Sequence, residues 1–66
     1  MMNNRQFEKI LQHIIHSIEA AGYDADNQII GYALTGDDSY ITRRGDSRTW
    51  IHKLDIEQIK DYYGLL

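Results

Sequence analysis

The sequence predicts an all-α fold, a small bundle of four short helices forming a homodimer, in a single helical domain over residues 1–66. Apolar residues repeat with helical spacing near the N-terminus, and Asp and Gly recur where helices would begin and end. The chain has no Cys, so no disulfide can reinforce its small core. Oligomerisation is then the expected source of additional stability.

The first helix is predicted over residues 5–21. Its apolar residues form one stripe of an amphipathic helix, Asn4 is the expected N-cap, and Gly22 closes the helix because Gly adopts the left-handed conformation without strain. The stripe is wide for one short helix, so we expect a second copy of the chain to cover part of it. With three residues of a later helix, it gives the expected dimer and core face: Phe7, Ile10, Leu11, Ile14, Ile15, Ile18, Trp50, Ile51 and Leu54.

The next segment allows two interpretations. A helix capped by Asp24 or Asp26 would run through residues 28–34 and end at Gly36. Alternatively, an α+β fold would place a hairpin at residues 28–42, with IIGYAL and SYIT as strands joined by TGDD. Gly31 disfavours the helix by about 1 kcal/mol relative to Ala, whereas a lone hairpin is marginal in water. The helix is therefore favoured, and the hairpin remains the alternative.

The rest of the chain is predicted to hold a short turn, a loop and two more helices. Asp37 or Asp38 caps the turn, and Asp46 or Ser47 starts a helix that carries Trp50, Ile51 and Leu54. Asp55 and Gln58 form a pattern like a capping box, with Asp at the cap position and Gln at N3, and they start the last helix, which Gly64 closes.

Composition and motifs exclude several classes of function. The net charge of −3 disfavours nucleic-acid binding through overall charge. GYALTGD lacks the Lys of a phosphate-binding loop, and no nucleophile elbow or calcium loop is present. His13 and His16 have helical spacing but no evident third ligand. The sequence therefore predicts no enzyme, no cofactor and no metal site. With no signal peptide and no membrane-spanning apolar run, we expect a cytoplasmic protein.

A basic cluster lies between residues 43 and 53, and it consists of Arg43, Arg44, Arg48, His52 and Lys53. On a helix, Arg48 and His52 would share a face. One interpretation is internal pairing with Asp37, Asp38 or Asp46. The other is a docking surface for an acidic partner or a phosphate, which Arg suits because of its forked donors. Nucleic acid is a third interpretation, which the net charge disfavours.

The same part of the chain resembles the IreB-type regulatory phosphoproteins of Gram-positive bacteria. The residues that carry the resemblance are Gly22-Tyr23, Asn27-Gln28-Ile29-Ile30-Gly31-Tyr32, Leu34, Gly36-Asp37, Tyr40-Ile41, Arg43, Arg48, Ile51 and Lys53-Leu54. The resemblance implies a small, cytosolic, all-helical homodimer that regulates through protein–protein contacts. It also implies a place downstream of a membrane Ser/Thr kinase with PASTA repeats. There, family members affect cell-wall precursor synthesis and cephalosporin tolerance, in part by controlling proteolysis of the first committed enzyme of peptidoglycan synthesis.

The resemblance, together with the basic cluster, suggests a site for an unidentified cytosolic partner. The expected partner-binding residues are Gly36, Asp37, Tyr40, Ile41, Arg43, Arg48 and His52. The family's phosphorylated Thr residues precede the first helix, and the corresponding segment here, MMNNRQ, has no Thr or Ser. Kinase input is therefore doubtful, and no phosphorylation site is assigned. There are two further departures. The family's usual prolines are replaced by Ala25, Asp38 and Thr42, and His52 stands where a basic residue, usually Arg, is common. The alternative functions are a small helical nucleic-acid-binding protein and a self-assembling structural module.

Overall fold

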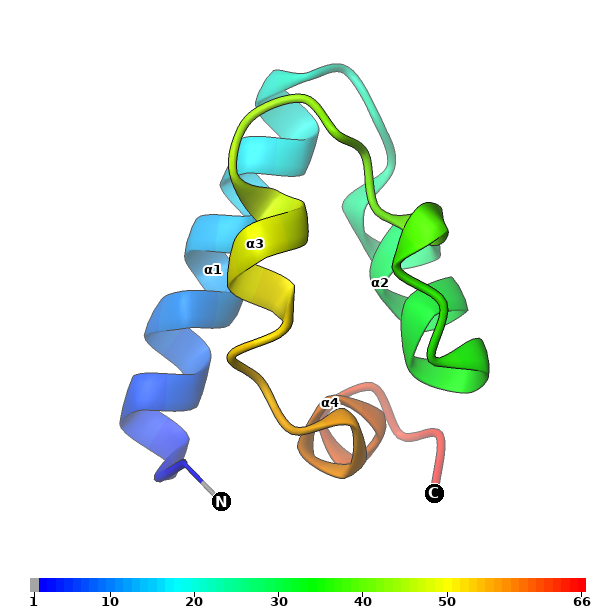
Figure 1. The fold of residues 1–66 in the computed structure, drawn as a ribbon. Helices are drawn as coiled ribbons and strands as arrows, with labels where there is room; N and C mark the ends of the chain where they lie inside the picture. The colour runs from blue at the N-terminus through cyan, green and yellow to red at the C-terminus, as the bar shows by residue number, and fades with distance from the viewer. Residues whose placement is uncertain (1) are drawn as a thin grey trace.

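The computed structural model describes residues 2–66, and the only regular elements in that range are helices, with no strand. The helices are α1 (Asn4–Ala20), α2 (Ala25–Thr35), α3 (Ser47–Ile51) and α4 (Ile56–Tyr62), and a 3-10 turn, η1 (Asp38–Tyr40), lies between α2 and α3. Figure 1 shows α3 lying along α1, and α4 at the end of the molecule where α1 begins. Helix α2 packs against α1 and α4. The all-α prediction is confirmed, and the hairpin at residues 28–42 is wrong. None of the described helices combines the length and the apolar character that crossing a membrane requires.

Local signals set the limits of α1 and α2. The N-cap of α1 is Asn3, one residue before the predicted position, and its side chain accepts a hydrogen bond from the backbone N–H of Gln6. After α1, Gly22 has a φ of 90°, which is the left-handed closure that the sequence predicted. Asp24 caps α2 by accepting from the N–H of Asn27, and Gly36, with a φ of 74°, ends it. The predictions for Gly22, Asp24 and Gly36 are confirmed because each depends on residues close together in the chain, whereas the predicted cap at Asn4 is wrong by one residue.

Helix α3 is shorter than predicted and ends before Leu54, which is nonetheless buried. Its N-cap residue, Asp46, makes no side-chain cap hydrogen bond. The carboxylate instead accepts from the indole Nε1 of Trp50 at 3.0 Å and lies 2.9 Å from Nε2 of His13 on α1. Asp46 therefore links α3 to α1 through side chains.

Helix α4 begins with half of the predicted capping box. Asp55 accepts hydrogen bonds from the backbone N–H groups of Glu57 and Gln58. The Gln58 side chain does not return to the cap. Its Nε2 donates to the carbonyl of Met2 at 2.9 Å and reaches Oδ1 of Asn4 at 3.5 Å. Gln58 therefore ties α4 to the start of α1.

A single hydrophobic core lies between the helices. Its buried members are Phe7, Leu11, Ile14, Ile18, Ala25, Ile29, Tyr32, Ala33, Ile41, Ile51, Leu54 and Ile59. Six residues of the predicted dimer and core face are among them, and the other three, Ile10, Ile15 and Trp50, are partly buried against this core. The stripe of α1 is thus covered mainly by its own chain, and only its edge is left for a second copy.

Candidate functional site

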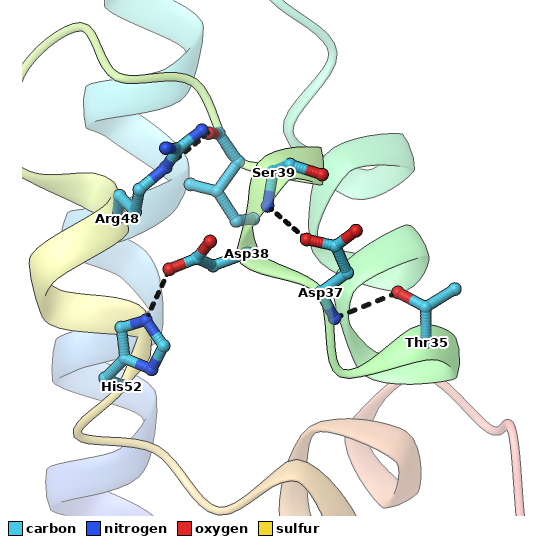
Figure 2. A network of polar contacts seen from close by, with 7 residues as sticks. Thr35, Asp37, Asp38, Ser39, Arg48 and His52 are labelled. Carbon is cyan, nitrogen blue, oxygen red and sulfur yellow. Dashed lines mark hydrogen bonds and ion pairs between the residues drawn. The ribbon is translucent and has the colours of Figure 1, made fainter.

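The segment that follows α2 holds most of the predicted partner-binding residues, and residues 36–43 are called the presented segment below. A chain of short-range hydrogen bonds shapes its start. Thr35 Oγ1 donates to the carbonyl of Gly31 at 2.8 Å and accepts from the N–H of Asp37 at 3.1 Å. The carboxylate of Asp37 then accepts from the N–H of Ser39 at 2.9 Å, which caps η1 (Figure 2). Gly36 makes the turn possible because its φ of 74° is costly for other residues.

Tyr40 packs against the backbone of α2 at Gly31. A Cβ atom built on Gly31 would lie 2.5 Å from Cδ1 of the Tyr40 ring, far closer than van der Waals contact. The ring can therefore occupy this position only because residue 31 has no side chain. About half of Tyr40 remains exposed. Gly31, which disfavours a helix by its propensity, therefore provides the space for Tyr40, a residue of the predicted site.

Arg48 fastens the presented segment to α3. Its Nε and Nη2 atoms donate to the carbonyl oxygen of Ile41 at 3.1 and 2.8 Å (Figure 2). The side chain of Ile41 is fully buried, so this residue belongs to the core and offers no side chain to a partner. Arg48 does make an internal contact, but with a carbonyl in place of the carboxylates that the sequence suggested. Arg48 and Ile41 therefore fix the conformation of the presented segment.

His52 makes a second connection between α3 and the segment. Its Nε2 lies 2.8 Å from Oδ2 of Asp38 (Figure 2). Its ring meets that of Tyr32 edge-on at a centroid distance of 6.1 Å. Tyr32 is buried, and this burial, helped by the charge of Asp38, raises the pKa of its phenol. Arg48 and His52, predicted to share a helix face, thus both reach the presented segment.

The carboxylate of Asp37 is held in its charged form. The pKa of Asp37 is lowered mainly by the hydrogen bond from the backbone N–H of Ser39. The side chain of Ser39 and the charge of Arg48 lower it further. Asp37 is exposed, so this negative charge faces solvent at the start of the segment.

The seven predicted partner-binding residues therefore have two different roles. Ile41 is buried and Arg48 is partly buried, whereas the exposed ones are Gly36, Asp37, Tyr40, Arg43 and His52. Within residues 2–66, no hydrogen bond or ion pair engages the guanidinium of Arg43. The segment thus presents a carboxylate, a phenol ring and a free guanidinium, and Arg48 and His52 hold it to α3.

The sequence analysis missed several residues that build the site. Tyr32, Thr35 and Ser39 are not among the predicted partner-binding residues, and neither is Gln28, whose Oε1 accepts from the N–H of Thr42 at 2.9 Å. The Asp-Asp-Ser string is typical of side-chain-capped turns and could have indicated Ser39. Nothing local indicates Gln28, because it meets its partner only once α2 and the segment have packed together.

The other end of α3 carries a separate polar cluster. Asp46 contacts His13 and Trp50, and the hydrogen bond with His13 is the main cause that lowers the pKa of Asp46. Lys53 places its Nζ 5.4 Å from the centre of the Trp50 ring. His13 is therefore engaged by a carboxylate rather than paired with His16. In the described part of the chain, no group of three or more His, Asp or Glu side chains is placed to hold a metal.

Comparison with known protein families places most of this chain within one family model. The model of the family described as IreB regulatory phosphoprotein matches residues 1–62. The matched range contains all four helices and the whole presented segment. It extends the resemblance carried by residues 22–54 to nearly the full chain.

Proposed function

Because this chain belongs to the IreB regulatory phosphoprotein family, we propose that it is a non-enzymatic regulator that acts by binding a protein partner through the presented segment. One observation carries the proposal. Hydrogen bonds of Arg48 and His52 hold the segment to α3, while the side chains of Asp37, Tyr40 and Arg43 are exposed to solvent. A fixed backbone with exposed side chains loses little conformational freedom on binding.

The chemistry of these three side chains suits a protein surface. Tyr and Arg are the residue types that most often dominate the binding energy of interfaces. The guanidinium of Arg43 can engage a carboxylate through two donors, and the carboxylate of Asp37 can accept from a basic side chain. The partner surface should therefore offer an acidic residue opposite Arg43 and an apolar pocket for the ring of Tyr40.

We place this regulator in the cytoplasm, in the pathway that links a PASTA-type Ser/Thr kinase to cell-wall synthesis and antibiotic tolerance. The support is the family match and the agreement of residues 22–54 with the family's motif. The phosphate acceptor in this chain is left unassigned.

The proposed regulator is a homodimer. Ile10, Ile15 and Trp50 are only partly covered by their own chain, and a second copy would complete their burial. Size-exclusion chromatography with light scattering should give about twice the chain mass of 7.7 kDa over a range of concentrations. A mass of one chain throughout would reject the dimer but leave the partner-binding proposal standing.

The test of partner binding uses a bacterial strain from which the gene has been removed. The wild-type chain should restore the normal level of cephalosporin tolerance and of the first committed enzyme of peptidoglycan synthesis. Arg43→Ala and Tyr40→Ala should not, and circular dichroism should show that both variants are folded. The matched control is Arg5→Ala, which removes an exposed Arg from the first turn of α1. Full function of the Arg43→Ala chain would contradict the proposal.

A further inference from the structure

The Ser and Thr hydroxyls of this chain are the class of acceptor that a Ser/Thr kinase modifies, and all of them lie in the part that the structure describes. The matched family is one of regulatory phosphoproteins, and the role proposed above leaves the phosphate acceptor open. The residues to compare are Ser17, Thr35, Ser39, Thr42, Ser47 and Thr49.

Four of these hydroxyls are covered or engaged in the folded chain. Ser47 has no exposed surface, and Ser17 is half-buried within α1. Thr35 is exposed, but its Oγ1 is engaged by two backbone groups. Thr42 is half-buried, and its Oγ1 accepts from the N–H of Arg44 at 3.1 Å. Adding a phosphate to any of these four residues would first require contacts of the folded chain to break.

Ser39 and Thr49 are both exposed, but they lie on different kinds of element. Thr49 is the third residue of α3, which is anchored in the core by the fully buried Ile51. Ser39 lies in the 3-10 turn η1, which buries none of its side chains. A segment with few buried contacts opens at a low cost in free energy. Ser39 can therefore enter a kinase active site at a lower cost than Thr49.

Ser39 also lies beside the two carboxylates at the start of the presented segment (Figure 2). Its backbone N–H donates to Oδ1 of Asp37 at 2.9 Å, and its side chain helps to lower the pKa of the same carboxyl. The preceding residue, Asp38, contacts His52 at 2.8 Å. A charge added at Ser39 would therefore act on the residues that shape η1 and join it to α3.

On the basis of the regulatory function proposed above, we propose that Ser39 is the phosphate acceptor and that its phosphorylation releases the presented segment. In this step Oγ of Ser39 attacks the γ-phosphorus of a nucleoside triphosphate, a nucleoside diphosphate leaves, and the hydroxyl proton passes to a base of the kinase. The phosphate brings a charge of about −1.5 to −2 next to Asp37 and Asp38. Like charges at this separation repel one another, so the cap that Asp37 forms on η1 weakens. The ring of Tyr40 then loses its fixed position, and the affinity for the partner falls.

The first experiment incubates the full chain with magnesium ATP and the catalytic domain of the host's PASTA-type Ser/Thr kinase, and maps the phosphate by fragmentation mass spectrometry. The wild-type chain should carry its phosphate on Ser39. Ser39→Ala should carry none, and the matched control Thr49→Ala should be phosphorylated to the same extent as the wild type. A phosphate on a different hydroxyl would overturn the assignment to Ser39 but leave the proposed kinase link standing. A chain that takes up no phosphate would reject both.

Hydrogen exchange followed by NMR tests the release of the segment. The N–H of Ile41 donates to the carbonyl of Asp38 at 2.9 Å and closes η1. Phosphorylation of Ser39 should speed the exchange of this amide by about fivefold, the size expected for charges at an exposed position. The amide of Gly22, which donates to the carbonyl of Glu19 outside the segment, is the control and should not change. Exchange at Ile41 that is unchanged or slower would overturn the proposed release.

Discussion

The guanidinium of Arg48 donates two hydrogen bonds to the carbonyl oxygen of Ile41, seven residues earlier in the chain. This contact joins α3 to the presented segment at the point where the segment enters the core. It also separates two arginines that resemble each other in the sequence: Arg48 is partly buried and shapes the site, whereas Arg43 is exposed and available to a partner.

Arg48→Ala should therefore destabilise the fold, because the carbonyl of Ile41 loses two charge-assisted donors. The expected loss in the free energy of unfolding is about 1.5–3 kcal/mol, measured by urea denaturation. Arg43→Ala is the control and should change stability by no more than about 0.5 kcal/mol. Equal effects of the two substitutions would contradict the different roles assigned to them.

Gly31→Ala should displace the ring of Tyr40, because the added Cβ would lie 2.5 Å from its Cδ1 atom. Ala by itself should stabilise the helix by about 1 kcal/mol relative to Gly. The clash with Tyr40 therefore acts against this gain in the free energy of unfolding. The double variant Gly31→Ala/Tyr40→Ala removes the clash and should be more stable to heat than Tyr40→Ala alone. If Gly31→Ala is as active as the wild type and more stable, the packing of Tyr40 on Gly31 has no role in positioning the ring.

Gly36→Ala should destabilise the fold through the backbone alone. No heavy atom lies within 4 Å of a Cβ built at Gly36, but its φ of 74° is left-handed and costs other residues about 1–2 kcal/mol. Gly36→Asn should cost less, since Asn tolerates this conformation better. Thermal unfolding of both variants tests this order, and a cost for Asn equal to or above that for Ala would argue against it.

Stability should fall in acid partly because of Asp37 and Asp46. Both carboxyls have a folded-state pKa below the ordinary value, so each stabilises the fold at pH above the unfolded-state pKa of about 4. That contribution is lost as the pH falls through the lower, folded-state pKa. Between about pH 6 and about pH 2, the free energy of unfolding should therefore fall by less in Asp46→Asn than in the wild type.

Glu57→Gln serves as the reference for this comparison, because it removes an exposed carboxylate of α4. Chemical denaturation at several pH values gives the slope of the unfolding free energy against pH for Asp46→Asn and for Glu57→Gln. An acid slope in Asp46→Asn as steep as that of the reference would show that the contact with His13 does not stabilise the folded state.

The fold was predictable where its signals are local. Helix spacing gives α1, and Asp24 and Gly36 give the ends of α2, because these residues act on their own or the next turn. The site was predictable only as a stretch of sequence. The contact of His52 with Asp38 is one of the internal pairings that the sequence offered for the basic cluster. The contact of His13 with Asp46 joins residues 33 positions apart, and no periodic pattern marks such a pair.

Ile41 illustrates the limit most clearly. It follows Tyr40 in the motif, and both residues looked equally available to a partner. In the structure Ile41 is fully buried and Tyr40 is 48% exposed. Which of two neighbouring side chains turns inward depends on how the segment packs against α3, and this packing is set by Arg48 from elsewhere in the chain.

The contact of Gln58 with Met2 has a consequence for how the molecule opens. It spans 56 positions, and it fastens a helix of seven residues that is too short to be stable alone. Helices at chain ends usually fray, and their amide protons then exchange with solvent quickly. Here α4 cannot come loose without breaking the contact of Gln58 with Met2 and exposing the buried side chain of Ile59, so its amides should exchange more slowly than those of a fraying helix.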